Sequence, residues 1–147
     1  MDWVEESKQI FKAKKPSHFT DYKHCEECAE HDETLKNAEI ETIGLGELGN
    51  PGWDPICFCT EEGKKYYMPS FMRLSLESIE DEFYFGQFLF HLEYDGEKNS
   101  LIQSCSKIQR DFIASFVKYM IESFSNEIEK NGYSDEALRA YELWTKA

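Results

Sequence analysis

The sequence predicts an α+β fold in a single domain covering residues 1–147, with helices packed around a small antiparallel sheet. Three observations lead to this prediction. Several segments repeat apolar residues at helical spacing, short aromatic-rich runs resemble strands, and turn residues separate the two kinds of segment. A chain of 147 residues has the usual size of one domain, and its eleven Phe, eight Tyr and three Trp can fill a core.

Five helices are predicted, and the best supported covers residues 107–124. Ser106 and Gln109 form a capping box in front of it, and apolar residues recur along it with the helical repeat. The other four predicted helices cover residues 3–14, 21–37 and 70–78 and the segment that Ser134 caps. For the helix over 21–37, Thr20 or Asp21 is the expected cap.

Short strands are predicted on both sides of the helix over 70–78. Residues 56–59 and 65–68 are expected to form a hairpin, with residues 60–63 as its turn. Residues 83–94 fit both a helix and a strand, and their aromatic content favours a strand that pairs with residues 101–103. Residues 44–55 are rich in glycine and proline, which predicts an ordered loop.

The formal net charge of −13 limits the partners that the chain is expected to bind. Such a surface repels the phosphates of nucleic acids and of anionic membranes, so neither is expected as a partner. A basic protein or a cation is the natural counterpart, although acidity also serves solubility alone. We see no signal peptide and no apolar stretch of about 20 residues, and five cysteines suit a reducing compartment, so we expect a cytoplasmic protein of unknown oligomeric state.

The segment 21–37 has one side rich in Cys and His and one acidic side. Placed at 100° per residue, the first side collects His24, Cys28, His31 and Leu35, flanked by Cys25 and Asp32. The opposite side collects Glu26, Glu30 and Glu33. Because carboxylates prefer water, we expect the Cys/His side to face the protein interior.

The same side predicts a zinc site, since zinc binds thiolate and imidazole ligands in a tetrahedron. The predicted ligands are Cys25, Cys28, His31 and His24. One helix cannot comfortably supply a whole tetrahedron, so a further ligand is expected from Cys57, Cys59 or His91. In the alternative interpretation, the cysteines are small buried apolar residues and the histidines make ordinary hydrogen bonds.

Two sequence strings resemble a family of small bacterial proteins of unknown function. Residues 24–35 read HCEECAEHDETL, and residues 48–58 read LGNPGWDPICF, with the loop GNPGWDP inside the second string. Shorter strings at residues 63–69 and 87–92 extend the resemblance, which covers roughly residues 18–120. The resemblance implies a bacterial cytosolic protein with a compact domain, and it implies no activity.

No complete catalytic motif is present, so the sequence favours a non-enzymatic binding or regulatory protein, with a structural zinc on Cys25, Cys28 and His31. Residues 44–49 match the dinucleotide-binding pattern GxGxxG, but Asn-Pro-Gly after it cannot begin the required helix. Two enzymatic alternatives stay open. One is a metal-dependent hydrolytic enzyme with deaminase-like zinc chemistry, and the other is a thiol redox protein that uses Cys25 and Cys28.

Overall fold

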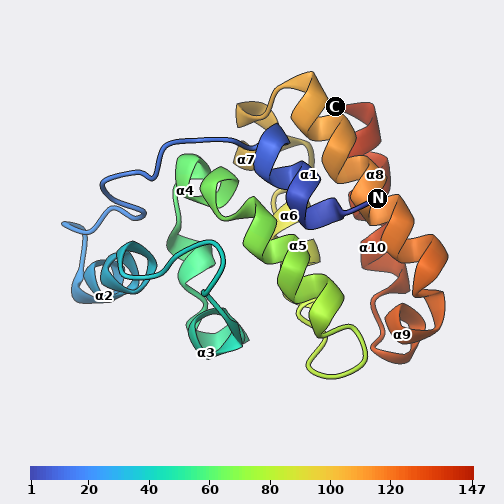
Figure 1. The fold of residues 1–147 in the computed structure, drawn as a ribbon, viewed down its shortest axis with the longest axis horizontal. Helices are drawn as coiled ribbons and strands as arrows, with labels where there is room; N and C mark the ends of the chain where they lie inside the picture. The colour runs from blue at the N-terminus through green and yellow to red at the C-terminus, as the bar shows by residue number, and fades with distance from the viewer. The chain divides into compact units, whose positions relative to one another are not determined.

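The computed structural model describes all residues 1–147, and every regular element in it is a helix. Figure 1 shows coiled ribbons and no strand arrow. The predicted α+β fold with an antiparallel sheet is therefore wrong. The chain divides into two compact units, residues 1–74 and 75–147, and the prediction of a single domain stays a prediction.

Before α5, the first unit contains six short helical elements, beginning with its N-terminal helix. They are α1 (Trp3–Ile10), α2 (Glu26–Lys36), α3 (Leu45–Leu48), the 3₁₀ helices η1 (Pro51–Trp53) and η2 (Pro55–Phe58), and α4 (Glu61–Tyr66). Helix α5 (Met68–Glu77) contains the boundary between the units. The second unit contains α6 (Phe85–Glu93), η3 (Gly96–Lys98), α7 (Ser100–Ser104), α8 (Lys107–Ser123), α9 (Ser125–Lys130) and α10 (Ser134–Lys146).

The predicted hairpin over residues 56–68 is wrong because its turn residues cap a helix instead. The Thr60 hydroxyl accepts a hydrogen bond from the Gly63 N–H at 3.1 Å, and this bond starts α4. Two glutamates lie in the first turn of α4 and two lysines near its end, an order that the helix dipole favours. The residues predicted as the first strand form η2 up to Phe58.

The predicted strands at 83–94 and 101–103 are also helices, α6 and α7. In α6 the buried residues follow the helical repeat, and Phe90, which a strand would bury beside Phe88, is 49% exposed. The buried Asn99 joins the two helices. Its side-chain oxygen accepts from the Ile102 N–H at 3.0 Å, and its amide donates to the His91 carbonyl at 3.0 Å.

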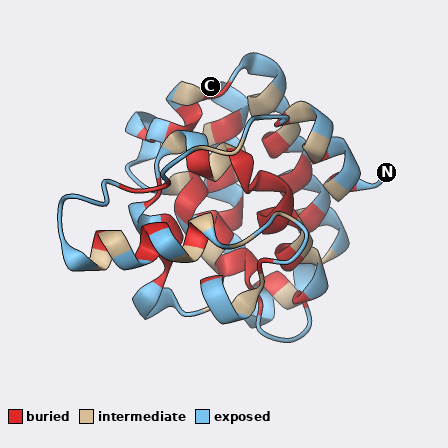
Figure 2. Cartoon of the chain, turned by 60° about the vertical axis from the view of Figure 1, so that its left-hand side comes forward, coloured by how far each residue is buried: buried red, intermediate tan, exposed pale blue.

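The prediction for α8 is confirmed, including the capping box of Ser106 and Gln109. Helix α10 packs against α8 and α6 in the second unit. There the Trp144 indole N–H donates to the Leu92 carbonyl at 2.8 Å, which ties α10 to the end of α6. Along α8 and α10, buried and exposed residues alternate with the helical repeat (Figure 2). No helix combines the length and the apolar character needed to cross a bilayer.

In the first unit, packing around α2 sets the position of the candidate site. Helix α2 packs against η2, and the Tyr67 hydroxyl donates to the Leu35 carbonyl at 2.6 Å, close to the C-terminal end of α2. Residues 44–55, predicted as a loop, contain the short helices α3 and η1. Gly63 lies where a side chain has no room, since an added Cβ would be 2.5 Å from the Cys59 sulfur and 2.8 Å from the Phe19 ring.

We expect Gly63→Ala to destabilise the protein by about 1–3 kcal/mol, because the new methyl overpacks a closed contact. Gly46→Ala is the matched control, since no atom lies within 4 Å of a Cβ added there. The control should change stability by no more than about 1 kcal/mol, in the stabilising direction. Urea denaturation followed by circular dichroism measures both variants, and equal stability of the two would contradict the packing around Gly63.

Candidate metal centre

Helix α2 begins at Glu26, five residues later than predicted, and its N-cap is Cys25. The backbone of Cys25 is extended, and its sulfur accepts the Cys28 N–H at 3.4 Å. A side-chain acceptor at this position satisfies one of the free N–H groups of the first turn. The predicted caps Thr20 and Asp21 are therefore wrong, and the capping role brings the Cys25 sulfur to the Cys28 backbone.

The buried carboxylate of Asp32 holds the preceding segment against α2. It accepts hydrogen bonds from the Phe19 N–H at 2.6 Å and the Thr20 N–H at 3.2 Å, and it contacts the His18 Nδ1 at 2.8 Å. The Thr20 hydroxyl in turn donates to the Cys28 carbonyl at 2.7 Å. Sequence reasoning placed Asp32 at the edge of the inward side but missed this role, although a carboxylate on a buried face signals that it has donors around it.

The environment of Asp32 favours its ionised form. Burial by itself raises the pKa of a carboxyl group, but the hydrogen bonds with His18, Phe19 and Thr20 outweigh burial, so the pKa of Asp32 lies below its usual value. Since the group is ionised in the folded protein, the charge strengthens each hydrogen bond that it accepts.

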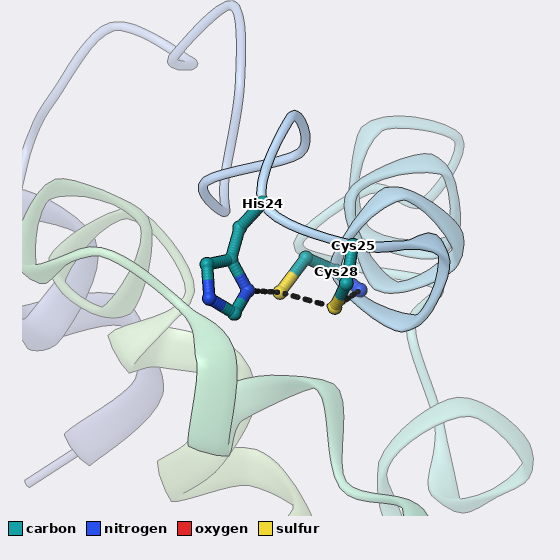
Figure 3. A group of neighbouring side chains, drawn as sticks. All are labelled: His24, Cys25 and Cys28. Atoms are coloured by element: carbon teal, nitrogen blue, oxygen red, sulfur yellow. Dashed lines mark hydrogen bonds between the residues drawn. The ribbon is translucent and has the colours of Figure 1, made fainter.

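His24, Cys25 and Cys28 point toward one another at the N-terminus of α2 (Figure 3). The two sulfurs are 3.3 Å apart, and the His24 Nδ1 lies 3.7 Å from the Cys28 sulfur. The ligand atoms of all three residues lie within 4.8 Å of one another. His24 and Cys25 are exposed and Cys28 is buried, so this group, which we call the His24–Cys28 group, opens to solvent on one side.

The two thiols of the group have opposite pKa shifts. The N–H of Cys28 lowers the pKa of Cys25, and the hydrogen bonds with the Cys28 thiol and the His24 ring lower it further. The pKa of Cys28 is raised, first by its hydrogen bond with Cys25 and then by burial. The pKa of His24 is raised by the same contact with Cys25. Cys25 is therefore the thiol that ionises first, and a helix N-terminus favours the resulting thiolate.

The structure confirms that Cys28 and His31 face the interior, but it places His31 outside the His24–Cys28 group. The imidazole of His31 is fully buried, and its ring centroid lies 4.6 Å from Trp53 and 4.8 Å from Phe58. Neither ring nitrogen has a hydrogen-bond partner. Its Nε2 lies 3.7 Å from a carboxylate oxygen of Glu27.

The other predicted ligands also lie outside the group. Cys57 is exposed, and partial burial and then Asp54 raise the pKa of its thiol. Cys59 is buried, and burial raises the pKa of its thiol well above the ordinary range. His91 is a buried residue of α6 in the second unit. Their roles as metal ligands stay predictions.

No protein-family model, no curated protein and no solved structure matches this chain. The resemblance to the bacterial family stays a prediction. The chemistry of the site comes from the His24–Cys28 group, which has the geometry to hold a metal ion.

We expect Asp32→Ala to destabilise the protein by about 1–3 kcal/mol at neutral pH, because two buried N–H groups lose their acceptor. The folded pKa of Asp32 lies below its unfolded value, so the stabilisation is present above the unfolded pKa and is lost as pH falls through the folded one. Urea denaturation should therefore show a difference between the variant and the original protein that narrows toward acid pH. The control Glu33→Ala removes an exposed carboxylate of the same helix, and a comparable loss there would contradict the anchoring role of Asp32.

Proposed function

We propose that the protein binds a divalent zinc ion through the His24 Nδ1 and the sulfurs of Cys25 and Cys28. The observation that supports this most is the convergence of three ligand atoms from one short segment within 4.8 Å. Around a shared zinc ion, with bonds of about 2.0–2.3 Å, ligand atoms stand about 3.3–3.8 Å apart. The separations of 3.3 and 3.7 Å in this group therefore suit zinc with small side-chain rotations.

The donor set favours zinc over the hard cations. Two thiolates and one imidazole are soft or borderline ligands, whereas magnesium and calcium prefer oxygen. Two thiolates also neutralise the charge of a divalent ion. The lowered pKa of Cys25 reduces the cost of deprotonating the first thiol, and metal binding deprotonates the second.

Three ligands leave one tetrahedral position for a fourth. The charges of Asp21 and Glu27 raise the pKa of Cys28, so these two carboxylates are acidic candidates for that position. A fourth protein ligand would make the zinc structural, as the sequence favours, while a bound water would permit the hydrolytic alternative. Deaminase-like zinc chemistry needs a glutamate as general base, in the pattern His-x-Glu, and here Glu33, two residues after His31, lies exposed on the other side of α2.

We expect untagged protein to bind one zinc ion per chain at this group and one cobalt ion in its place, with the sulfur-to-cobalt absorption of thiolate ligands. His24→Ala, Cys25→Ser and Cys28→Ser each remove one ligand and should lower zinc affinity at least about tenfold. Titration of the metal-free protein with zinc against a chelating dye measures this. Cys105→Ala is the control, since it removes a buried thiol of the second unit. Unchanged zinc affinity of Cys28→Ser would sink the proposal.

A second candidate function, thiol–disulfide exchange, is favoured by the asymmetry of the two thiols. An exposed thiol of lowered pKa precedes a buried thiol of raised pKa, with their sulfurs 3.3 Å apart. In this reaction the Cys25 thiolate attacks a disulfide of a substrate and releases one of its sulfurs as thiolate. The Cys28 thiolate then attacks the mixed disulfide, which frees the second substrate sulfur and leaves Cys25 and Cys28 oxidised to a disulfide.

We expect iodoacetamide to modify Cys25 first in the metal-free protein and at lower pH than an ordinary thiol, because the thiolate is the reactive form. His24→Ala should slow this reaction near neutral pH by removing one of the interactions that lower the pKa. Mass spectrometry of digested protein locates the modified residue, with the exposed Cys57, whose pKa is raised, as the internal control. Faster modification of Cys57 than of Cys25 would rule out the redox candidate.

A further inference from the structure

Two exposed aromatic rings lie over the buried His31 in the first unit. Trp53 is 44% exposed and Phe58 is 39% exposed, and both ring centroids lie within 5 Å of the His31 ring centroid. The rings come from η1 and η2, and η2 packs against α2. Trp53, His31 and Phe58 thus form one aromatic cluster whose two outer members reach solvent.

A carboxylate stands at the edge of this cluster. Glu27 precedes His31 by one turn of α2, its side chain is 42% exposed, and its oxygen lies 3.7 Å from the His31 Nε2. The surrounding stretch is strongly acidic, since six carboxylates between residues 21 and 33 face a single lysine, Lys23. Exposed aromatic faces beside a carboxylate attract cations, because the face of the ring is the negative part of its quadrupole and the carboxylate is also negative.

The chain itself supplies no cation to these rings. Lys23, the lysine of this acidic stretch, lies over the ring of Tyr22, with its Nζ 5.7 Å from the ring centroid. Its charge is therefore placed on an aromatic ring outside the cluster. No lysine or arginine of the chain lies over Trp53 or Phe58. An exposed aromatic surface next to Glu27, a carboxylate that no lysine or arginine of the chain pairs with, is complementary to a basic group from outside.

We propose that Trp53, Phe58 and Glu27 form a docking site for an arginine side chain of a basic polypeptide partner. Arginine fits this arrangement better than lysine, because a planar guanidinium stacks on an aromatic ring while its N–H groups pair with a carboxylate. His31 is a positioning residue, since its buried ring supports both outer rings from below. The site uses none of the three proposed zinc ligands and shares only Glu27 with the candidates for the fourth position, so its test is made without metal and its outcome is separate from that function.

The test uses a synthetic peptide of four arginines alternating with glycines and a second peptide with citrulline in place of each arginine. Citrulline keeps the planar shape and removes the charge. Isothermal titration calorimetry in the presence of EDTA measures binding to the full chain with no metal at the His24–Cys28 group. We expect the arginine peptide to bind and the citrulline peptide to bind at least about tenfold more weakly.

Variants then place the binding on the cluster. Trp53→Leu should weaken binding of the arginine peptide about three- to tenfold, Trp53→Phe should retain most of it, and Glu27→Gln should weaken it about twofold or more. Phe90→Leu is the matched control, since Phe90 is 49% exposed in the second unit. Equal binding of the citrulline peptide, normal binding by Trp53→Leu, or an equal loss in Phe90→Leu would each overturn the proposal.

Discussion

The hydrogen bonds of the buried Asp32 carboxylate determine where the candidate metal ligands lie in the first unit. Removing a carboxylate from water is costly, and here the cost is offset by the N–H groups of Phe19 and Thr20 and by the His18 ring. These bonds hold residues 18–20, which precede α2, against the helix. Only residues 21–25 separate Thr20 from the first residue of α2, so anchoring Thr20 also limits where His24 and Cys25 lie, next to Cys28.

The N-terminus of α2 explains why two candidate functions share one group of residues. The free N–H groups of the first turn favour an anionic sulfur at the cap, so Cys25 has the lowered pKa and Cys28, one turn later and buried, has the raised one. A zinc ion requires both thiols as thiolates, whereas thiol exchange uses them in sequence. Because a bound metal would block the nucleophile, the two functions exclude each other at any one moment.

Helix α2 also connects the metal centre with the aromatic cluster. Cys28 and His31 are three residues apart and therefore lie on the same side of the helix, with Cys28 among the metal ligands and His31 under Trp53 and Phe58. The glutamates of the other side stay exposed and give this region its negative charge. Helix α2 thus carries soft metal ligands at its start and, one turn later, the histidine on which the aromatic rings of η1 and η2 pack.

The sequence by itself determined the local features whose cause is local: the capping box of α8 and the inward direction of Cys28, His31 and Leu35 on α2. It could not determine whether residues 56–59, 65–68 and 83–94 are strands, because short apolar runs fit both the strand repeat of two residues and the helical repeat of about 3.6 residues. A strand also requires a second strand to pair with it, which a local sequence does not show. Nor could it choose the ligands, since His24 joins Cys25 and Cys28 while His31 lies under two rings from η1 and η2. Tertiary structure decided these points, because packing between segments distant in sequence selects which side chains meet.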